Sequence, residues 1–158
     1  MDNKVQAQNN INYAIHANII YRFTKYIDWP ASHKGGDFVI GIVGESPLFD
    51  ELKNFITNKT VGEQRIVIRR ITVSSGSFNG HIIFIPENEN DKLKKISSIT
   101  AGTATLIVTE SSGSARKGAC ISLATVNEHL KMEINKNNIE KRKLSIAPEL
   151  LQLGHIVI

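Results

Sequence analysis

The chain has 158 residues, is 41% hydrophobic and 22% charged, and carries a formal net charge of +4 at pH 7. This length suits one domain, and the composition argues against a disordered, collagen-like or disulfide-rich protein. Because acidic residues accompany the lysines and arginines along the same segments, the positive charge is not concentrated as in a nucleic-acid binder, and we expect no nucleic-acid partner.

We expect residues 1–8 to form a disordered N-terminal tail and residues 9–158 to form a single domain. No apolar run reaches the roughly eighteen residues of a transmembrane helix, and Met1-Asp2-Asn3-Lys4 lacks the hydrophobic stretch of a signal peptide. Cys120 lies in an apolar run, which favours a buried, inert thiol over a reactive or intermolecular one. A single cysteine excludes a disulfide within the chain.

The first predicted element is an amphipathic helix over residues 9–28. Trp29-Pro30 ends it, because the residue before a proline is disfavoured in the helical region. Its apolar stripe repeats every four residues and consists of Ile11, Ile15, Ile19, Phe23 and Ile27.

The next predicted unit is a strand, a loop and a helix. Residues 38–43 are a continuous apolar run, which is typical of a strand buried on both faces of a parallel sheet. Ser46 is a candidate N-cap and Pro47 a favourable first helical residue, so a helix follows with Leu48 and Leu52 on its buried side.

The middle of the chain alternates strands and helices. Apolar and charged residues alternate over 65–73, which predicts a half-exposed edge strand followed by a turn at 74–77. Residues 81–85 and 105–109 are predicted buried strands, and the polar segment 88–99 is a predicted helix between them.

The pattern changes near the C-terminal end. Residues 119–126 and 129–134 are predicted strands joined by Asn127-Glu128, an antiparallel hairpin, and short helices are expected at 137–143 and 148–154. The whole order predicts an α/β fold: a three-layer domain with a mostly parallel sheet, helices on both faces and an antiparallel hairpin at one edge.

No residue set matches a known catalytic or metal-binding motif. None of the five histidines is three or four residues from another, and no Cys-x-x-Cys pair exists, so we expect no metal site. The chain lacks Gly-x-Ser-x-Gly, and the segment 41–46 lacks the Gly-Lys-Ser/Thr ending of a phosphate loop. We therefore expect neither enzymatic activity nor a cofactor.

Ligands of open α/β sheets bind at the carboxyl ends of the parallel strands, where helix N-termini offer free N–H groups to anions. A small polar ligand could bind at these ends, and the alternative is that the same residues are ordinary turn and cap residues. The candidate ligand-binding residues are Gly44, Glu45, Ser46, Glu110, Ser111, Ser112 and Arg116.

Taken together, several segments resemble the YfiR family. The more specific ones are the predicted helix that closes in Trp29-Pro30 and the sequence Glu133-Ile134-Asn135 before the last predicted helices. The order and spacing of the segments carry the resemblance, which runs through residues 18–30, 38–44, 81–85, 105–110, 118–121, 132–135 and 150–151.

The resemblance implies a periplasmic, non-enzymatic regulatory protein whose signal peptide has been removed from the given sequence. Such a protein forms a homodimer, binds the periplasmic sensor region of a membrane-bound diguanylate cyclase and represses it, so that cyclic-di-GMP and biofilm formation respond to envelope conditions. The family's redox-active cysteine pairs have no counterpart here, since Cys120 is the single cysteine and His81 stands near a position where relatives have cysteine. A thiol switch within one chain is therefore excluded.

We expect the partner to be held by an apolar patch that occludes it. The candidate partner-binding residues are Tyr21, Trp29, Lys131, Glu133, Leu150 and Leu151. For the aromatic residues the alternative is that they only fasten the first helix to the sheet, and Glu133 could simply face solvent. A small-ligand sensor that uses the strand ends is the alternative function.

Overall fold

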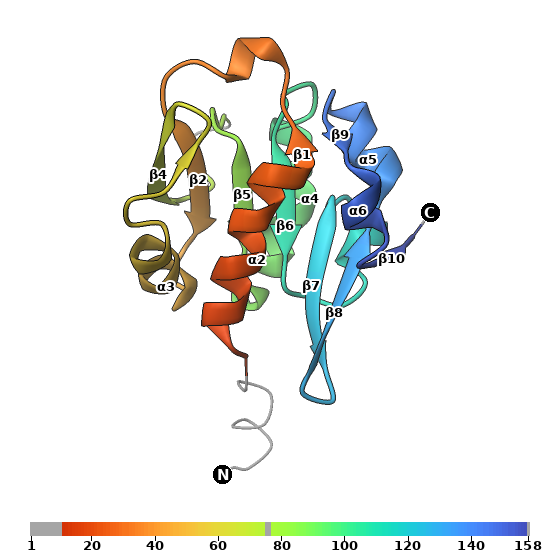
Figure 1. Ribbon diagram of the computed structural model, residues 1–158. Coiled ribbons are helices and arrows are strands. Elements are labelled where there is room, and N and C mark those ends of the chain that lie inside the picture. Colours follow the sequence, from red (N-terminus) through yellow and green to blue (C-terminus); the bar gives the residue numbers. More distant parts are fainter. Residues whose placement is uncertain (1–10, 75–76, 158) are drawn as a thin grey trace.

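The computed structural model describes residues 11–74 and 77–157, and the predicted tail at 1–8 lies outside these ranges. Its centre is an eight-stranded sheet with the order β10-β8-β7-β6-β5-β2-β4-β3 (Figure 1). The strands are β2 (Phe38–Val43), β3 (Thr60–Val61), β4 (Gln64–Ile71), β5 (Ile82–Ile85), β6 (Leu106–Thr109), β7 (Ile121–Val126), β8 (His129–Ile134) and β10 (His155–Ile156).

Most neighbouring strands are parallel, as predicted. The pairs β4–β2, β2–β5, β5–β6, β6–β7 and β8–β10 are parallel, whereas β7–β8 and β3–β4 are antiparallel. All residues of β2, β5 and β6 are buried, which explains their continuous apolar runs. The predicted mostly parallel α/β sheet with an antiparallel hairpin is confirmed.

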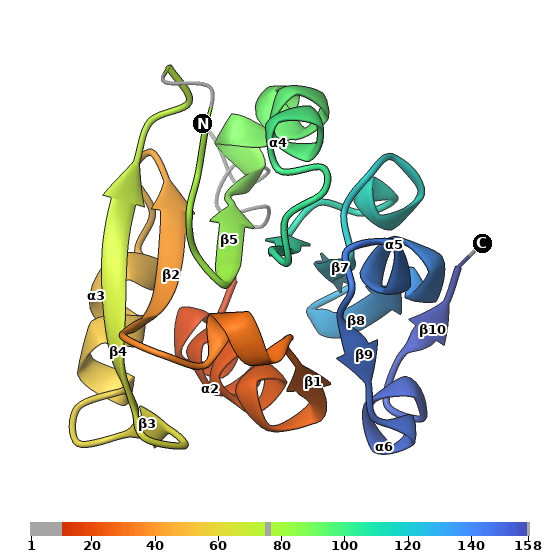
Figure 2. The same ribbon diagram turned by 90° about the horizontal axis from the view of Figure 1, so that it is seen from above.

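Helices cover both faces of the sheet. Helices α2 (Tyr13–Tyr26) and α3 (Leu48–Phe55) lie on one face, and α4 (Leu93–Ile99) lies on the other (Figure 2). Two short helices, α5 (Lys136–Lys141) and α6 (Pro148–Leu151), follow the hairpin. No helix among the described residues is long and apolar enough to cross a membrane.

Local sequence explains where these helices begin. Asn12 caps α2, because its Oδ1 accepts hydrogen bonds from the backbone N–H groups of Ala14 (3.1 Å) and Ile15 (3.3 Å). Before α3, the Ser46 Oγ accepts a hydrogen bond from the Leu48 N–H (3.1 Å), as its predicted capping role requires. The segment predicted as one helix over 88–99 is a 3₁₀ helix, η2 (Glu87–Lys92), continued by α4.

The ends of two predicted helices are wrong. The first helix does not reach residue 28, because Ile27–Asp28 forms β1, which pairs antiparallel with β9 (Ser145–Ile146). The last helix stops at Leu151, and the chain then forms β10 beside β8. These small pairings fasten the end of α2 and the C-terminal segment to the rest of the fold.

The predicted edges of the sheet are also corrected. β4 is not outermost, since the two-residue β3 pairs with its free side, and β10 lies outside the β7–β8 hairpin. In the hairpin, Asn127 and Glu128 have φ values of +52° and +65°, as in a type I′ turn. Of the turn predicted at 74–77, residues 75–76 lie outside the described ranges.

Candidate functional site

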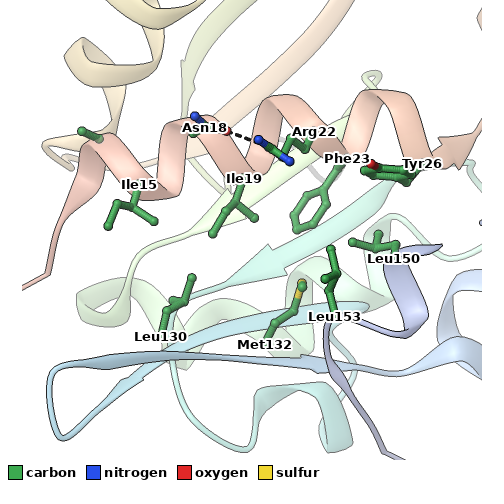
Figure 3. A pocket seen from close by; sticks show the side chains of 11 residues that line it. Ile15, Asn18, Ile19, Arg22, Phe23, Tyr26, Leu130, Met132, Leu150 and Leu153 are labelled. Atoms are coloured by element: carbon green, nitrogen blue, oxygen red, sulfur yellow. Dashed lines mark hydrogen bonds between the residues drawn. The ribbon is translucent and has the colours of Figure 1, made fainter.

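An apolar groove runs between α2 on one side and β8 with the α6 segment on the other (Figure 3). Its volume is about 530 Å³. The residues that line it are Ala14, Ile15, Asn18, Ile19, Arg22, Phe23, Tyr26, Leu130, Met132, Leu150 and Leu153.

The periodicities of a helix and a strand place these side chains together. On α2, Ile15 and Ile19 are one helical turn apart and point toward β8 (Figure 3). On β8, Leu130 and Met132 point toward α2, because alternate residues of a strand share a face. By the same alternation Lys131 lies on the opposite face of the sheet.

The groove is more exposed than a protein core. Three of the five large apolar side chains that are exposed among the described residues line it: Ile15 is 48%, Leu130 36% and Leu153 64% exposed. Contiguous exposed apolar surface marks interaction sites in folded proteins. Arg22 is the single charged residue in the lining, and its Nε donates a hydrogen bond to the Asn18 Oδ1 (2.9 Å). The groove can therefore hold an apolar segment that also carries an acidic group.

Besides the apolar groove, the structure contains a buried polar cluster. It lies at the carboxyl ends of β5 and β6, under the first turns of α2. The Glu110 carboxylate is buried, and its Oε2 accepts hydrogen bonds from the Tyr13 hydroxyl (3.3 Å) and the Glu87 backbone N–H (2.8 Å). Its Oε1 is 3.9 Å from the His16 Nε2. We call Tyr13, His16 and Glu110 the strand-end cluster.

Burial dominates the acid–base properties of the strand-end cluster. It lowers the pKa of His16 to about 4 and raises the pKa of Glu110. Burial and the nearby Glu110 carboxylate raise the pKa of Tyr13. Among the described residues, His16 Nδ1, His16 Nε2, Glu110 Oε1 and Ser111 Oγ are buried without a hydrogen-bond partner.

The strand-end cluster contains groups that general acid–base catalysis uses, but it is closed. His16 is 2% exposed and Glu110 is 5% exposed, so a substrate cannot reach either group in this conformation. The described residues also contain no group of three or more histidine, cysteine, aspartate or glutamate side chains that could hold a metal ion.

The candidate ligand-binding residues differ in exposure. Glu110 and Ser111 are buried, Gly44 and Ser46 are half-buried, and Glu45, Ser112 and Arg116 are exposed. The Ser46 side chain reaches the Tyr13 hydroxyl, which also donates a hydrogen bond to Glu110. The Glu45 carboxylate pairs with Arg70 (3.5 Å). Gly44 has a φ of +67°, a conformation that is strained for residues with a Cβ, so the turn itself favours glycine at this position.

The candidate partner-binding aromatics lie away from the groove. Tyr21 packs beside Phe55 of α3 at a ring distance of 5.8 Å. Trp29 is buried, and its Nε1 donates a hydrogen bond to the His81 carbonyl oxygen (3.3 Å). From this position Trp29 packs against the core, in agreement with the alternative that it fastens the end of the first helix.

The other candidate partner-binding residues are divided between the two faces. Leu150 forms part of the groove, and Leu151 is half-buried beside it. Lys131 and Glu133 lie on the opposite sheet face with 3.8 Å between their Nζ and Oε2 atoms, and the Glu133 Oε1 accepts a hydrogen bond from the Gly113 N–H (3.0 Å).

Sequence reasoning missed most of the groove. Ile15 and Ile19 belong to the apolar stripe that the sequence assigns to the core, and nothing in the spacing marks them as exposed. The alternation of Leu130 and Met132 in β8 was an available signal for a shared apolar face. The position of Leu153 depends on α6, which is only four residues long.

A family model described as YfiR/HmsC-like matches residues 13–155. The match therefore spans both walls of the groove and the whole strand-end cluster, from Tyr13 on α2 to His155 in β10. No curated protein matches the chain.

Proposed function

The chain belongs to the YfiR/HmsC-like family, and on this premise we propose that it is a non-enzymatic periplasmic regulatory protein. Its partner is the periplasmic sensor region of a membrane-bound diguanylate cyclase, which it binds and represses. Through this repression it modulates cyclic-di-GMP and biofilm formation.

The observation that carries the proposal is the apolar groove between α2 and β8. Ile15, Leu130 and Leu153 expose apolar surface at its rim, and Met132 lies between them (Figure 3). A partner segment that covers these side chains removes their apolar area from water, which is the main driving force of protein association. Arg22 at the rim favours a segment with an acidic side chain.

Occlusion needs only binding, not chemistry. A sensor segment held in the groove cannot also adopt the arrangement that activates its cyclase, so the equilibrium shifts toward the inactive state by the difference in affinity for the two states. The closed strand-end cluster agrees with this non-catalytic role, because its titratable groups are out of reach of a substrate.

The test is capture of the purified periplasmic segments of the membrane diguanylate cyclases encoded in the same genome. We expect one of them to bind the full chain, and Leu130→Glu to weaken binding at least about tenfold because it places a charge in the apolar groove. Capture of none of these segments would contradict the proposal.

The matched control is Val126→Glu. Val126 belongs to the same hairpin and is 43% exposed, against 36% for Leu130, but strand alternation places it on the opposite face with Lys131. Val126→Glu should leave capture within about twofold of wild type. Equal loss in both variants would place the binding surface outside the groove.

A further inference from the structure

His16 is a histidine without hydrogen-bond partners in the interior of the protein. It is 2% exposed, and neither ring nitrogen has a partner among the described residues. Its ring meets the edges of two aromatic rings, Tyr13 (5.4 Å between centroids) and Phe84 (6.4 Å). Buried polar groups are nearly always satisfied, so such an exception calls for a physical explanation.

The charged and titratable surroundings of His16 are limited. Tyr13 comes from its own helix, and Glu110 follows β6 with its Oε1 at 3.9 Å. Glu87, at the start of η2, donates its backbone N–H to Glu110, and its carboxylate acts on Glu110 and Tyr13. Glu110 thus already has two hydrogen-bond donors on its Oε2 and offers His16 only a distant oxygen.

A charged imidazole is therefore poorly accommodated. Burial opposes the charged form, and the Glu110 carboxylate at 3.9 Å does not offset it, so the pKa of His16 falls to about 4. If the first turns of α2 open, the ring meets water and regains an ordinary pKa of about 6.5. Protons therefore bind the opened form more tightly than the closed form, and acid favours opening.

We propose that His16, seated against Glu110, is a buried proton-binding site that releases the first turns of α2 when it takes up a proton. The same turns carry one wall of the groove, because Ala14 and Ile15 face the groove while Tyr13 and His16 face the strand ends. The relevance to partner binding rests on the proposed function; the proton-linked opening does not.

The pH dependence of this opening follows from the difference between the pKa of His16 in the closed form and in the opened form. The folded-state pKa of His16 is depressed, so the neutral ring stabilises the closed helix at pH 7, and this contribution is lost as pH falls below about 6.5. With pKa values of about 4 closed and about 6.5 opened, protonation of His16 alone raises the opening equilibrium about twentyfold between pH 7 and pH 5. The raised pKa of Glu110 acts in the opposite direction, since a protonated carboxyl stabilises the closed form.

Native-state hydrogen exchange of the full chain measures this opening without any partner. After correction for the intrinsic pH dependence of exchange, the amides of Ala17 and Ile20 should show opening about twentyfold greater at pH 5 than at pH 7 in Glu110→Gln, which lacks the opposing carboxyl, and a smaller rise in wild type. The rise should disappear in His16→Phe, alone or combined with Glu110→Gln. His155→Phe, at an exposed histidine, is the matched control and should behave as wild type.

Exchange in Glu110→Gln that is unchanged between the two pH values, or that rises equally when His16→Phe is added, would overturn the proposal. If His16→Phe does not fold, NMR titration of the wild-type imidazole decides: a midpoint near 4 supports the buried site, and a midpoint near 6.5 refutes it. Neither result depends on capture of a cyclase segment, so this proposal and the proposed function can fail separately.

Discussion

Arg142 is a buried arginine that donates hydrogen bonds to uncharged partners. Its Nη1 donates to the Thr100 carbonyl oxygen (3.1 Å), the Thr100 Oγ1 (2.9 Å) and the Thr105 carbonyl oxygen (3.4 Å). Its Nη2 donates to the Ser97 carbonyl oxygen (3.2 Å). Ser97 and Thr100 are at the carboxyl end of α4, where backbone carbonyls lack helical partners and a positive charge is favourable.

Replacing this guanidinium should therefore destabilise the fold. We expect Arg142→Ala to lower the free energy of unfolding by about 2–4 kcal/mol, because it removes buried, charge-assisted hydrogen bonds to the Ser97, Thr100 and Thr105 carbonyl oxygens. Urea denaturation measures the change, and Lys141→Ala, at the adjacent exposed residue, should change it by less than about 0.5 kcal/mol. Equal effects of the two substitutions would contradict this role of Arg142.

The sequence predicted the burial of some single residues but not of others. The sequence indicated a buried Cys120, and the structure places it in the core, where burial raises the pKa of its thiol. The sequence could not indicate that Trp29 is buried, because an indole before a proline can either pack in the core or remain exposed. The sequence could not predict that the ring nitrogens of His16 lack hydrogen-bond partners, because their surroundings include Glu110 and Phe84, which are distant in the sequence.

Among the elements, the β7–β8 hairpin combines a correct prediction with local strain. Its two turn residues, Asn127 and Glu128, both have positive φ. Asparagine tolerates this conformation, but for glutamate it is unfavourable by roughly 1 kcal/mol. The register of the six paired positions of β8, which places Leu130 and Met132 on the groove face, thus depends on a turn whose second residue is not the preferred one.

Glu128→Gly should therefore stabilise the protein by about 0.5–1 kcal/mol, since glycine adopts positive φ without a Cβ clash. The urea midpoint should rise at an unchanged slope. Glu140→Gly, in the last turn of α5, provides the opposite control and should lower stability by about 0.5–1 kcal/mol. A fall in the midpoint of Glu128→Gly would show that the side chain contributes more than the turn conformation.

Long apolar runs and strong turn signals made most helices and strands predictable from the sequence. The very short strands were not predictable. β2 was recognisable because all six of its residues are buried and apolar. β1, β9 and β10 have two residues each, too few for any periodicity, and their pairing is decided by tertiary contacts. The corrected ends of α2 and α6 follow directly from these pairings.

At the scale of the whole molecule, the groove joins the two ends of the described chain. Ile15 lies in the first turn of α2 and Leu153 just after α6, and both face Leu130 and Met132 of the hairpin (Figure 3). No local pattern contains this arrangement, because it requires β9 to pair with β1 and β10 to pair with β8. The fold class was therefore predictable from the sequence, whereas the groove required the packed structure.

Gly154 shows how closely the C-terminal segment must approach β8 to form the groove. A Cβ on this residue would lie 2.8 Å from the Ile134 Cδ1 and 3.0 Å from the Met132 carbonyl oxygen. Gly154→Val should push the segment that carries Leu153 away from β8, which lowers the free energy of unfolding by about 1–3 kcal/mol and, under the proposed function, weakens capture of the partner segment. Urea denaturation and the capture assay measure the two effects.

Gly35→Val, where a Cβ meets nothing within 4 Å, is the control and should change neither the free energy of unfolding nor capture. Full stability and full capture in Gly154→Val would mean that the groove tolerates a displaced C-terminal segment, and that α2 and β8 alone provide the binding surface.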